Sequence, residues 1–209
     1  MHKLIVHLGF TLDGVTQEPA RPDEDTRFGF KRGGWAAPNV DSVSMAIAAE
    51  GMAKKGGGLL IGRKTYEDFS NVWSAEIEIS TKAGPKRNDG NPVTQRLNQS
   101  QKYIASTTLK EPLAWVNSTL LKRDAWSSVA AVKEERDGDL AILGNGILSQ
   151  SLMKHNLIDE YHLSIYPLVL GSGSRLFPQE SPYAALKLVR STVFTTGVVI
   201  AVYQPADAK

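Results

Sequence analysis

The sequence contains no cysteine, and this absence removes several kinds of chemistry at once. A chain without cysteine forms no disulfide, no cysteine-ligated zinc site and no iron–sulfur cluster, and it has no thiol nucleophile. Histidine is scarce as well, with four residues in 209, and no two of them form an H-x₃-H pair of the kind that holds a metal. A metal site would have to be built from carboxylates, and we expect none.

The chain also lacks a marked excess of charge and any long hydrophobic run. Its 24 basic and 22 acidic side chains leave a net charge of +2, which is too small for counterion-driven binding of nucleic acid. No apolar run approaches the roughly 18 residues of a membrane span, and the first one, Leu4-Ile5-Val6-His7-Leu8, is too short for a signal peptide. We therefore expect a cytoplasmic protein with a small-molecule substrate and no nucleic-acid or membrane partner. We also expect residues 1–209 to form one domain.

What the sequence does contain is an alternation of short apolar runs and helical patterns. The pattern predicts strands at residues 3–10, 59–61, 102–105, 115–117, 140–143 and 157–170, and a C-terminal hairpin of residues 186–194 and 198–203. Helices are predicted between the strands: residues 41–55, the segment after Gly62, 93–99, a helix around Val129 capped by Ser118 or Thr119, and one ending near His155. This order is typical of an α/β fold with a mostly parallel sheet, flanking helices and an antiparallel edge.

Three predicted strands end in loops that could bind phosphate. These loops are Gly62-Arg63-Lys64-Thr65, Ser106-Thr107-Thr108 and Gly144-Asn145-Gly146. The first and third lead into helices, whose N-termini offer free N–H groups and a positive dipole end to an anion. In open α/β sheets, ligands bind beyond the carboxyl ends of strands. Together the three loops suit a dinucleotide that carries an additional phosphate.

Each loop also has a simpler interpretation. Thr65 could cap a helix, the hydroxyls of residues 106–108 could close a turn, and residues 144–146 could be a tight turn. A standard Rossmann site is not expected, because Ser149 replaces the last glycine of its fingerprint. His7, on the first strand, is expected to be a hydrogen-bonded structural residue.

The order of these motifs resembles the dihydrofolate reductase superfamily, specifically the branch of the riboflavin-biosynthesis reductase C-terminal domain. The resemblance covers nearly the whole chain. It is carried by Thr11-Leu12-Asp13-Gly14, Gly33-Gly34-Trp35-Ala36 with Pro38, Gly62-Arg63-Lys64-Thr65-Tyr66-Glu67, Tyr103-Ile104-Ala105-Ser106-Thr107-Thr108-Leu109, Gly144-Asn145-Gly146, Leu157-Ile158-Asp159-Glu160-Tyr161, Pro167-Leu168-Val169-Leu170-Gly171-Ser172-Gly173, Arg175-Leu176-Phe177 and Thr196-Gly197-Val198-Val199.

The resemblance implies a central sheet of about eight strands and NADPH as hydride donor. It places the adenosine phosphate of the cofactor at the first two loops, the pyrophosphate at the Gly-x-Gly loop and the nicotinamide under the turn at Asp13 and Gly14. The implied cofactor-binding residues are Asp13, Gly14, Gly62, Arg63, Lys64, Thr65, Ser106, Thr107, Thr108, Gly144, Asn145, Gly146 and Ile147.

The chain departs from folate reductases at the carboxylate that binds and helps to protonate the pterin. Their spacing places that carboxylate at position 46, where this sequence has alanine. Asp41, at the start of the predicted helix, is our candidate catalytic and substrate-binding residue, although it could instead be the N-cap of that helix. Trp35 is the candidate aromatic wall of a pocket between the first strand, residues 33–38 and that helix.

The leading hypothesis is an NADPH-dependent reductase of a small heterocyclic or carbonyl/imine substrate. One alternative makes the substrate a ribosylamino-pyrimidine of riboflavin-type biosynthesis, whose phosphate would meet Arg27, Lys31 and Arg32. The other is an NADP-binding sensor without catalytic activity, which the alanine at position 46 favours. The C-terminal hairpin offers an edge through which the protein could form a homodimer.

Overall fold

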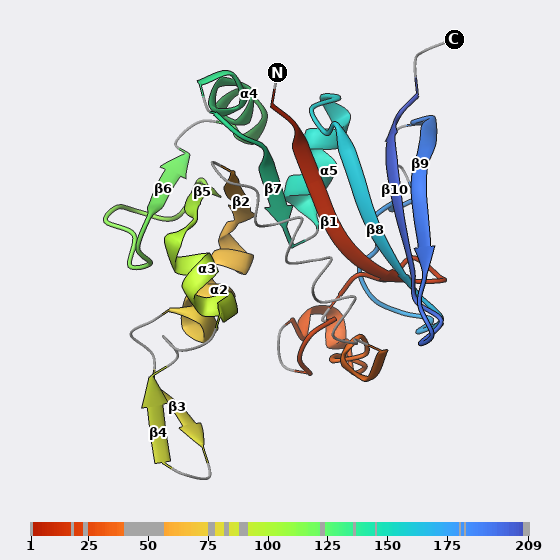
Figure 1. Cartoon of the computed structure of the whole chain (residues 1–209), viewed down its shortest axis with the longest axis horizontal. Helices are drawn as coiled ribbons and strands as arrows, with labels where there is room; N and C mark the ends of the chain where they lie inside the picture. Colours follow the sequence, from red (N-terminus) through yellow and green to blue (C-terminus); the bar gives the residue numbers. More distant parts are fainter. Residues whose placement is uncertain are drawn as a thin grey trace.

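Figure 1 shows the chain as a computed structural model. The structure describes residues 2–17, 19–22, 25–39, 57–74, 78–81, 84–87, 92–121, 124–135, 137–144, 146–179, 181 and 183–206. The predicted helix of residues 41–55, including Asp41, lies outside the described residues, and so does Asn145.

An eight-stranded sheet forms the centre of the fold (Figure 1). Its order is β6 (Ser118–Leu121), β5 (Gln101–Ala105), β2 (Gly58–Gly62), β7 (Leu140–Leu143), β1 (Leu4–Thr11), β8 (Glu160–Tyr166), β10 (Val199–Pro205) and β9 (Leu186–Val193). Neighbours from β6 to β8 pair in parallel, whereas β10 pairs antiparallel with both β8 and β9. The prediction of a mostly parallel sheet with a C-terminal antiparallel hairpin is confirmed.

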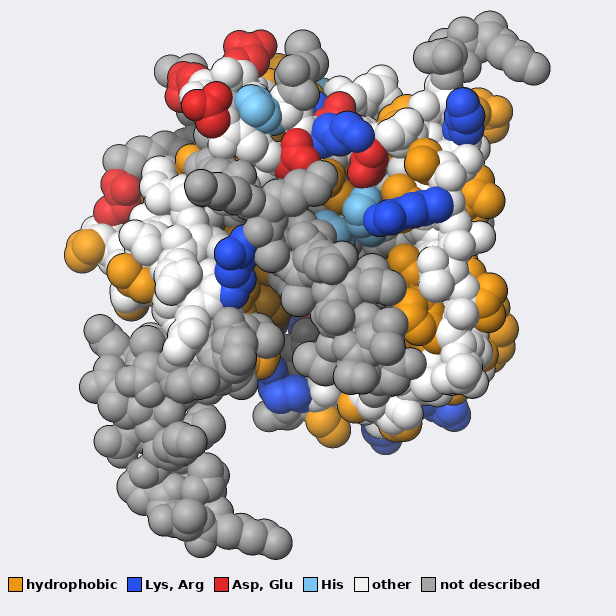
Figure 2. All heavy atoms as spheres, viewed as in Figure 1, with side chains coloured by type: hydrophobic (Ala, Val, Ile, Leu, Met, Phe, Trp, Pro, Cys, Tyr) orange, Lys and Arg blue, Asp and Glu red, His pale blue; other side chains and the backbone are white. Residues whose placement is uncertain are grey.

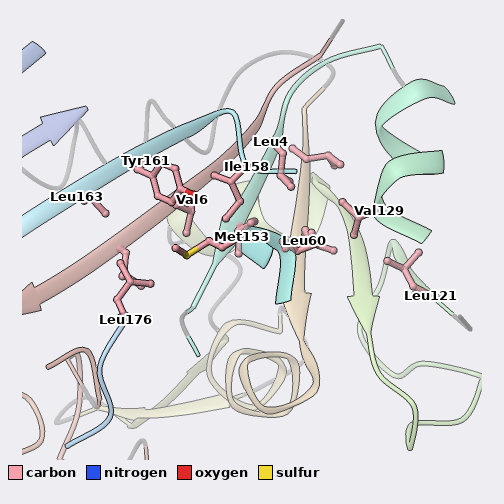
Figure 3. Packing of buried hydrophobic residues seen from close by; sticks show 14 residues of the cluster. Leu4, Val6, Leu60, Leu121, Val129, Met153, Ile158, Tyr161, Leu163 and Leu176 are labelled. Carbon is pink, nitrogen blue, oxygen red and sulfur yellow. The ribbon is translucent and has the colours of Figure 1, made fainter. Parts of the chain in front are cut away.

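Alternate residues of each strand face opposite layers of helices, because successive side chains of a strand point to opposite faces of the sheet. Leu4, Val6 and Leu8 of β1 pack in one cluster with side chains of α4 (Ala125–Glu135) and α5 (Ile147–Lys154), as Figure 3 shows in part. The other face of the central strands packs against α2 (Arg63–Trp73) and α3 (Pro92–Gln99). Since paired residues share a face, His7 lies on the α2 side with its partner Leu143.

A third cluster closes the carboxyl ends of β1 and β8. It contains Val15, Phe30, Trp35, Ala36, Tyr166 and Val198. Most of these residues come from the loop that follows β1, in which the structure has two short 3₁₀ turns, Arg27–Gly29 and Ala37–Asn39. The long loop is thus folded against the strand ends.

The segment between α2 and β5 contains a hairpin of β3 (Glu78–Thr81) and β4 (Gly84–Arg87), followed by α3. Figure 1 shows this hairpin projecting from the body of the molecule. Among the described residues, no helix is both long enough and apolar enough to span a membrane.

Two local predictions were wrong. The predicted strand at residues 115–117 is a turn, and the strand begins at Ser118 instead. Asn117 takes the left-handed conformation (φ 55°), and its side-chain amide donates to the carbonyl of Asn98, which stops the chain from continuing as a strand there. Ser118 lies within β6, so it cannot cap the next helix, and Asp124 caps α4 by accepting a hydrogen bond from the Ser127 N–H.

Candidate functional site

The three loops predicted to bind phosphate begin side by side. β2 lies between β5 and β7, with Gly62 opposite Ala105 and Ile61 opposite Leu143. All three strands run parallel, so their carboxyl ends meet at one edge of the sheet. The sheet order therefore brings together the loops after Gly62, Ala105 and Leu143.

Two of these loops present the N-terminus of a helix. Gly62 is the N-cap of α2 and Gly146 is the N-cap of α5. Glycine has no side chain with which to satisfy the first-turn N–H groups, and such groups bind anions readily. Thr65 was considered as the N-cap of α2, but it lies inside the helix. Arg63 is half exposed and pairs with Glu67 one turn later at 3.0 Å, and Lys64 is exposed.

The first and third loops are in close contact. Gly144 has a φ of +81°, and a Cβ built on it would overlap the hydroxyl of Thr65 and lie 3.2 Å from Thr65 Cγ2. Gly146 also has positive φ (+102°), but a Cβ there would meet nothing within 4 Å. Gly144 is therefore required for packing between loops, whereas the backbone at Gly146 borders open space in front of α5. Ile147, which follows, is 81% exposed.

In the second loop, the Ser106 hydroxyl is hydrogen-bonded within the loop itself. Ser106 Oγ accepts hydrogen bonds from the N–H groups of Thr108 (3.2 Å) and Leu109 (3.0 Å), which is the turn-closing role considered for it. Thr107 and Thr108 are exposed. Ser106 holds the shape of the loop, and its two threonines are the residues that can meet a ligand.

Hydrogen bonds to Asp13 join the turn after β1 to the loop after β8. Its carboxylate accepts hydrogen bonds from the Thr11 hydroxyl (2.6 Å) and from the N–H groups of Leu170 (3.2 Å) and Gly171 (2.7 Å). These bonds, that from Thr11 above all, lower the pKa of Asp13, so it is an anion at neutral pH. Sequence reasoning placed this turn at the cofactor and missed the contact, because Gly171 is far away in the sequence.

Trp35 lies in the packed cluster at the end of the sheet. It is 6% exposed, its indole N–H donates to the carbonyl of Gln17 at 2.7 Å, and its ring meets that of Tyr166 edge to face at 5.1 Å. The structure thus places Trp35 over the end of β8. Its role as a pocket wall remains a prediction.

The loop before Trp35 contains two ion pairs that the sequence did not indicate, and one of them joins the loop to α2. Arg21 pairs with Asp68 of α2. Asp25 is held by Arg27, with 2.6 Å between Arg27 Nε and Asp25 Oδ1, and this bond and the nearby Lys64 lower the pKa of Asp25. Arg27 was a candidate phosphate ligand, and it is already paired with a carboxylate.

Comparisons with known proteins agree with this architecture. A family model described as the RibD C-terminal domain matches residues 2–200. The uncharacterized protein YyaP of Bacillus subtilis (strain 168) is 29% identical over 153 residues, which cover 69% of this chain and 72% of that protein.

Two solved structures share the fold. A pyrimidine reductase-like protein from Corynebacterium diphtheriae aligns with a TM-score of 0.63 and 11% identity, over 99% of this chain and 93% of that one. Dihydrofolate reductase from Enterococcus faecalis, complexed with NADP(H), aligns with a TM-score of 0.59 and 12% identity, over 98% and 97%. The chain belongs to the RibD C-terminal domain family and has the dihydrofolate reductase-like fold, as the resemblance of its motifs predicted.

Proposed function

We propose that the protein is a reductase that transfers a hydride from NADPH to an electrophilic carbon of a small heterocyclic or carbonyl/imine substrate. The observation that carries this proposal is the set of three loops on adjacent strand ends, two of which present a glycine-capped helix N-terminus. Membership of the RibD C-terminal domain family supports a reductase-type function. The structurally similar dihydrofolate reductase, which is complexed with NADP(H), supports the choice of cofactor.

The residues present fit this cofactor. The open backbone at Gly146, followed by the N-terminus of α5, suits a pyrophosphate, whose negative charge the helix dipole stabilises. Arg63 and Lys64 at the start of α2, with the exposed hydroxyls of the second loop, suit the phosphate on the adenosine. When bound, NADPH supplies the hydride, and the chain fixes the two reactants in position.

The substrate would lie over β1 and β8, beside the cluster that contains Trp35. A ribosylamino-pyrimidine is the second candidate substrate, because a similar structure is described as pyrimidine reductase-like. Its phosphate would have to meet Lys31 and Arg32, which are exposed, since Arg27 is occupied by Asp25. Asp41 remains the proposed carboxylate of the pocket, although it lies outside the described residues.

Thermal unfolding with NADPH and with NADH tests cofactor binding. A ligand at 100 times its Kd stabilises the native state by about 2.7 kcal/mol, which raises Tm by roughly 5–10 °C for a chain of this size. We expect NADH to raise Tm less than NADPH does. In the double variant Arg63→Gln/Lys64→Gln, we expect the Tm rises with the two cofactors to become more nearly equal. The matched control is Lys154→Gln, at an exposed position in the last turn of α5. No rise in Tm with NADPH would refute the proposal.

A substrate panel separates the enzyme from the sensor. The panel contains a dihydropteridine, a cyclic imine, an aldehyde and a ribosylamino-pyrimidine phosphate, and the readout is consumption of the NADPH absorbance. Turnover of one class identifies the substrate. Stabilisation by NADPH without turnover of any compound favours the sensor.

We also propose that the protein forms a homodimer through β9. This strand is the outer edge of the sheet, and its Leu188, Val189 and Val193 are 50%, 50% and 74% exposed. An edge strand with apolar side chains and open backbone groups is a template for pairing with a second copy. Light scattering should show a dimer that Val189→Lys/Val193→Lys dissociates. A wild-type monomer at high protein concentration would contradict this proposal.

A further inference from the structure

The face of β1 and β8 that lies on the α2 side carries a connected polar cluster. The ring of His7 meets that of His162 at 4.6 Å, and His162 Nε2 lies 2.9 Å from Glu160 Oε2. The other oxygen of Glu160 accepts hydrogen bonds from Lys3 Nζ (2.5 Å) and Gln204 Nε2 (2.9 Å). The side chains of His162 and Glu160 are only 16% and 12% exposed. In the view of Figure 2, histidine, basic and acidic side chains gather over this part of the sheet.

This cluster begins where β7 ends. His7 is opposite Leu143, the last residue of β7, and the next residue is Gly144 of the loop proposed to hold the pyrophosphate. β1 continues beyond this point to Thr11, and its next residue on the same face is Gly9, which packs against Tyr166. His7 therefore lies between the Gly-x-Gly loop and the aromatic pair of Trp35 and Tyr166.

The proposed reduction needs a proton from this region. When a C=N or C=O carbon gains the hydride and its two electrons, NADPH leaves as NADP⁺ and the π pair moves to nitrogen or oxygen. That atom must then bond to a proton. Imidazole is the side chain best suited to give one at neutral pH, because it titrates there. The alanine at position 46 leaves the carboxylate of folate reductases without a counterpart at that position.

We propose that His7 is the catalytic residue that gives this proton, with His162 and Glu160 as positioning residues. This inference rests on the proposed function. The imidazolium of His7 loses its proton to the substrate nitrogen or oxygen, becomes neutral, and regains a proton from solvent. The His162 ring meets the His7 ring edge to face at 4.6 Å and so holds it in position.

Glu160 stabilises the positive charge of the imidazolium. Although burial opposes its ionisation, hydrogen bonds from Lys3, His162 and Gln204 bring the pKa of Glu160 to about 2, so it is an anion wherever histidine titrates. Other charged groups on this face, among the described residues, are Lys3, which bonds Glu160, and Lys102 of β5, whose register partner is Leu59. On β9 they are Arg190 and Lys187, which pair with Val202 and Gln204. Glu160 is the carboxylate that contacts His162 directly.

Nuclear magnetic resonance of the full chain labelled in its histidine rings tests where His7 lies. The four histidine signals can be assigned with single His→Gln variants, and the probe is NADP⁺. We expect NADP⁺ to move the His7 signal and to leave those of His2 and His155 unchanged, since His155 stacks on Trp126 at the end of α5. If NADP⁺ raises Tm and the His7 signal stays in place, this inference is wrong. If NADP⁺ does not raise Tm, the proposed function fails and this inference fails with it.

Variants test the proton transfer itself with the panel compound that is reduced fastest. His7→Gln should lower kcat at pH 7 by about 100-fold or more and keep the NADP⁺-induced rise in Tm. His155→Gln is the matched control and should keep kcat. Glu160→Gln should move the alkaline fall of the kcat profile to lower pH, which a merely structural role would not do. A His7→Gln enzyme within about threefold of wild type, or an unmoved profile in Glu160→Gln, would overturn the assignment.

Discussion

Lys102 gives the sharpest test of how this fold tolerates a buried charge. It lies on β5 with no exposed surface, and its ammonium donates hydrogen bonds to the carbonyls of Leu97 and Ser100, both at 2.8 Å. The same group lies 4.7 Å from the centre of the Trp115 ring. Burial lowers the pKa of Lys102 from 10.5 to about 8. Between those pH values the unfolded chain binds a proton that the native protein has lost.

The free energy of unfolding should therefore rise with pH over this window. The difference in pKa corresponds to about 3 kcal/mol, gained as the pH rises from about 8 to about 10.5. Urea unfolding at a series of pH values measures this gain in wild type and in Lys102→Met, because methionine has a similar volume and no charge. The stability of wild type relative to Lys102→Met should increase by up to that amount. The matched control is Lys154→Met, at an exposed position in the last turn of α5, which should follow wild type. A difference between wild type and Lys102→Met that stays constant with pH would refute the reasoning.

Two further predictions concern the loops and the polar cluster. Gly146→Ala meets no neighbour but has a positive φ, and should cost about 1–3 kcal/mol in urea unfolding. Gly144→Ala adds an overlap with Thr65 to a positive φ, and should cost about 1–3 kcal/mol more than Gly146→Ala. Equal losses in the two variants would contradict this account. Glu160, with its pKa lowered from 4.5 to about 2, should contribute about 3 kcal/mol that is present above pH 4.5 and lost as the pH falls to 2. Glu160→Gln should remove this loss of unfolding free energy at acid pH. An acid unfolding profile that Glu160→Gln leaves unchanged would contradict the contribution assigned to Glu160.

The sequence alone predicted the sheet because its strands are short apolar runs bounded by glycine or polar turns. β1, β2, β5 and β7 lie within two residues of the predicted bounds, and the three phosphate-competent loops lie at neighbouring strand ends. The failures came where tertiary contacts determine the local backbone. Trp115 lies in a turn because its indole N–H donates to Asn98 and its ring packs against Tyr66 and Lys102. Nothing in a β-branched or aromatic pattern carries that information.

In the candidate site, too, local motifs could be predicted and long-range contacts could not. The glycines and bases of the loops could be found from their order, whereas the contacts between distant segments could not. His7 was expected to be a structural residue, since nothing near it in the sequence indicates that it meets His162. Likewise, the hydrogen bonds from Leu170 and Gly171 to Asp13 join two loops that only the parallel pairing of β1 and β8 brings together.

The hydrogen bonds to Asp13 restrict how a ligand could enter the end of the sheet. Two N–H groups of the loop after β8 donate hydrogen bonds to the Asp13 carboxylate, and bonds to a charged acceptor are among the stronger ones. A movement of the turn that carries Asp13 must therefore break these hydrogen bonds or take the loop after β8 with it. On the other side, the loop before Trp35 is held to α2 by the partly buried ion pair of Arg21 with Asp68, so a movement of this loop away from α2 must separate that pair.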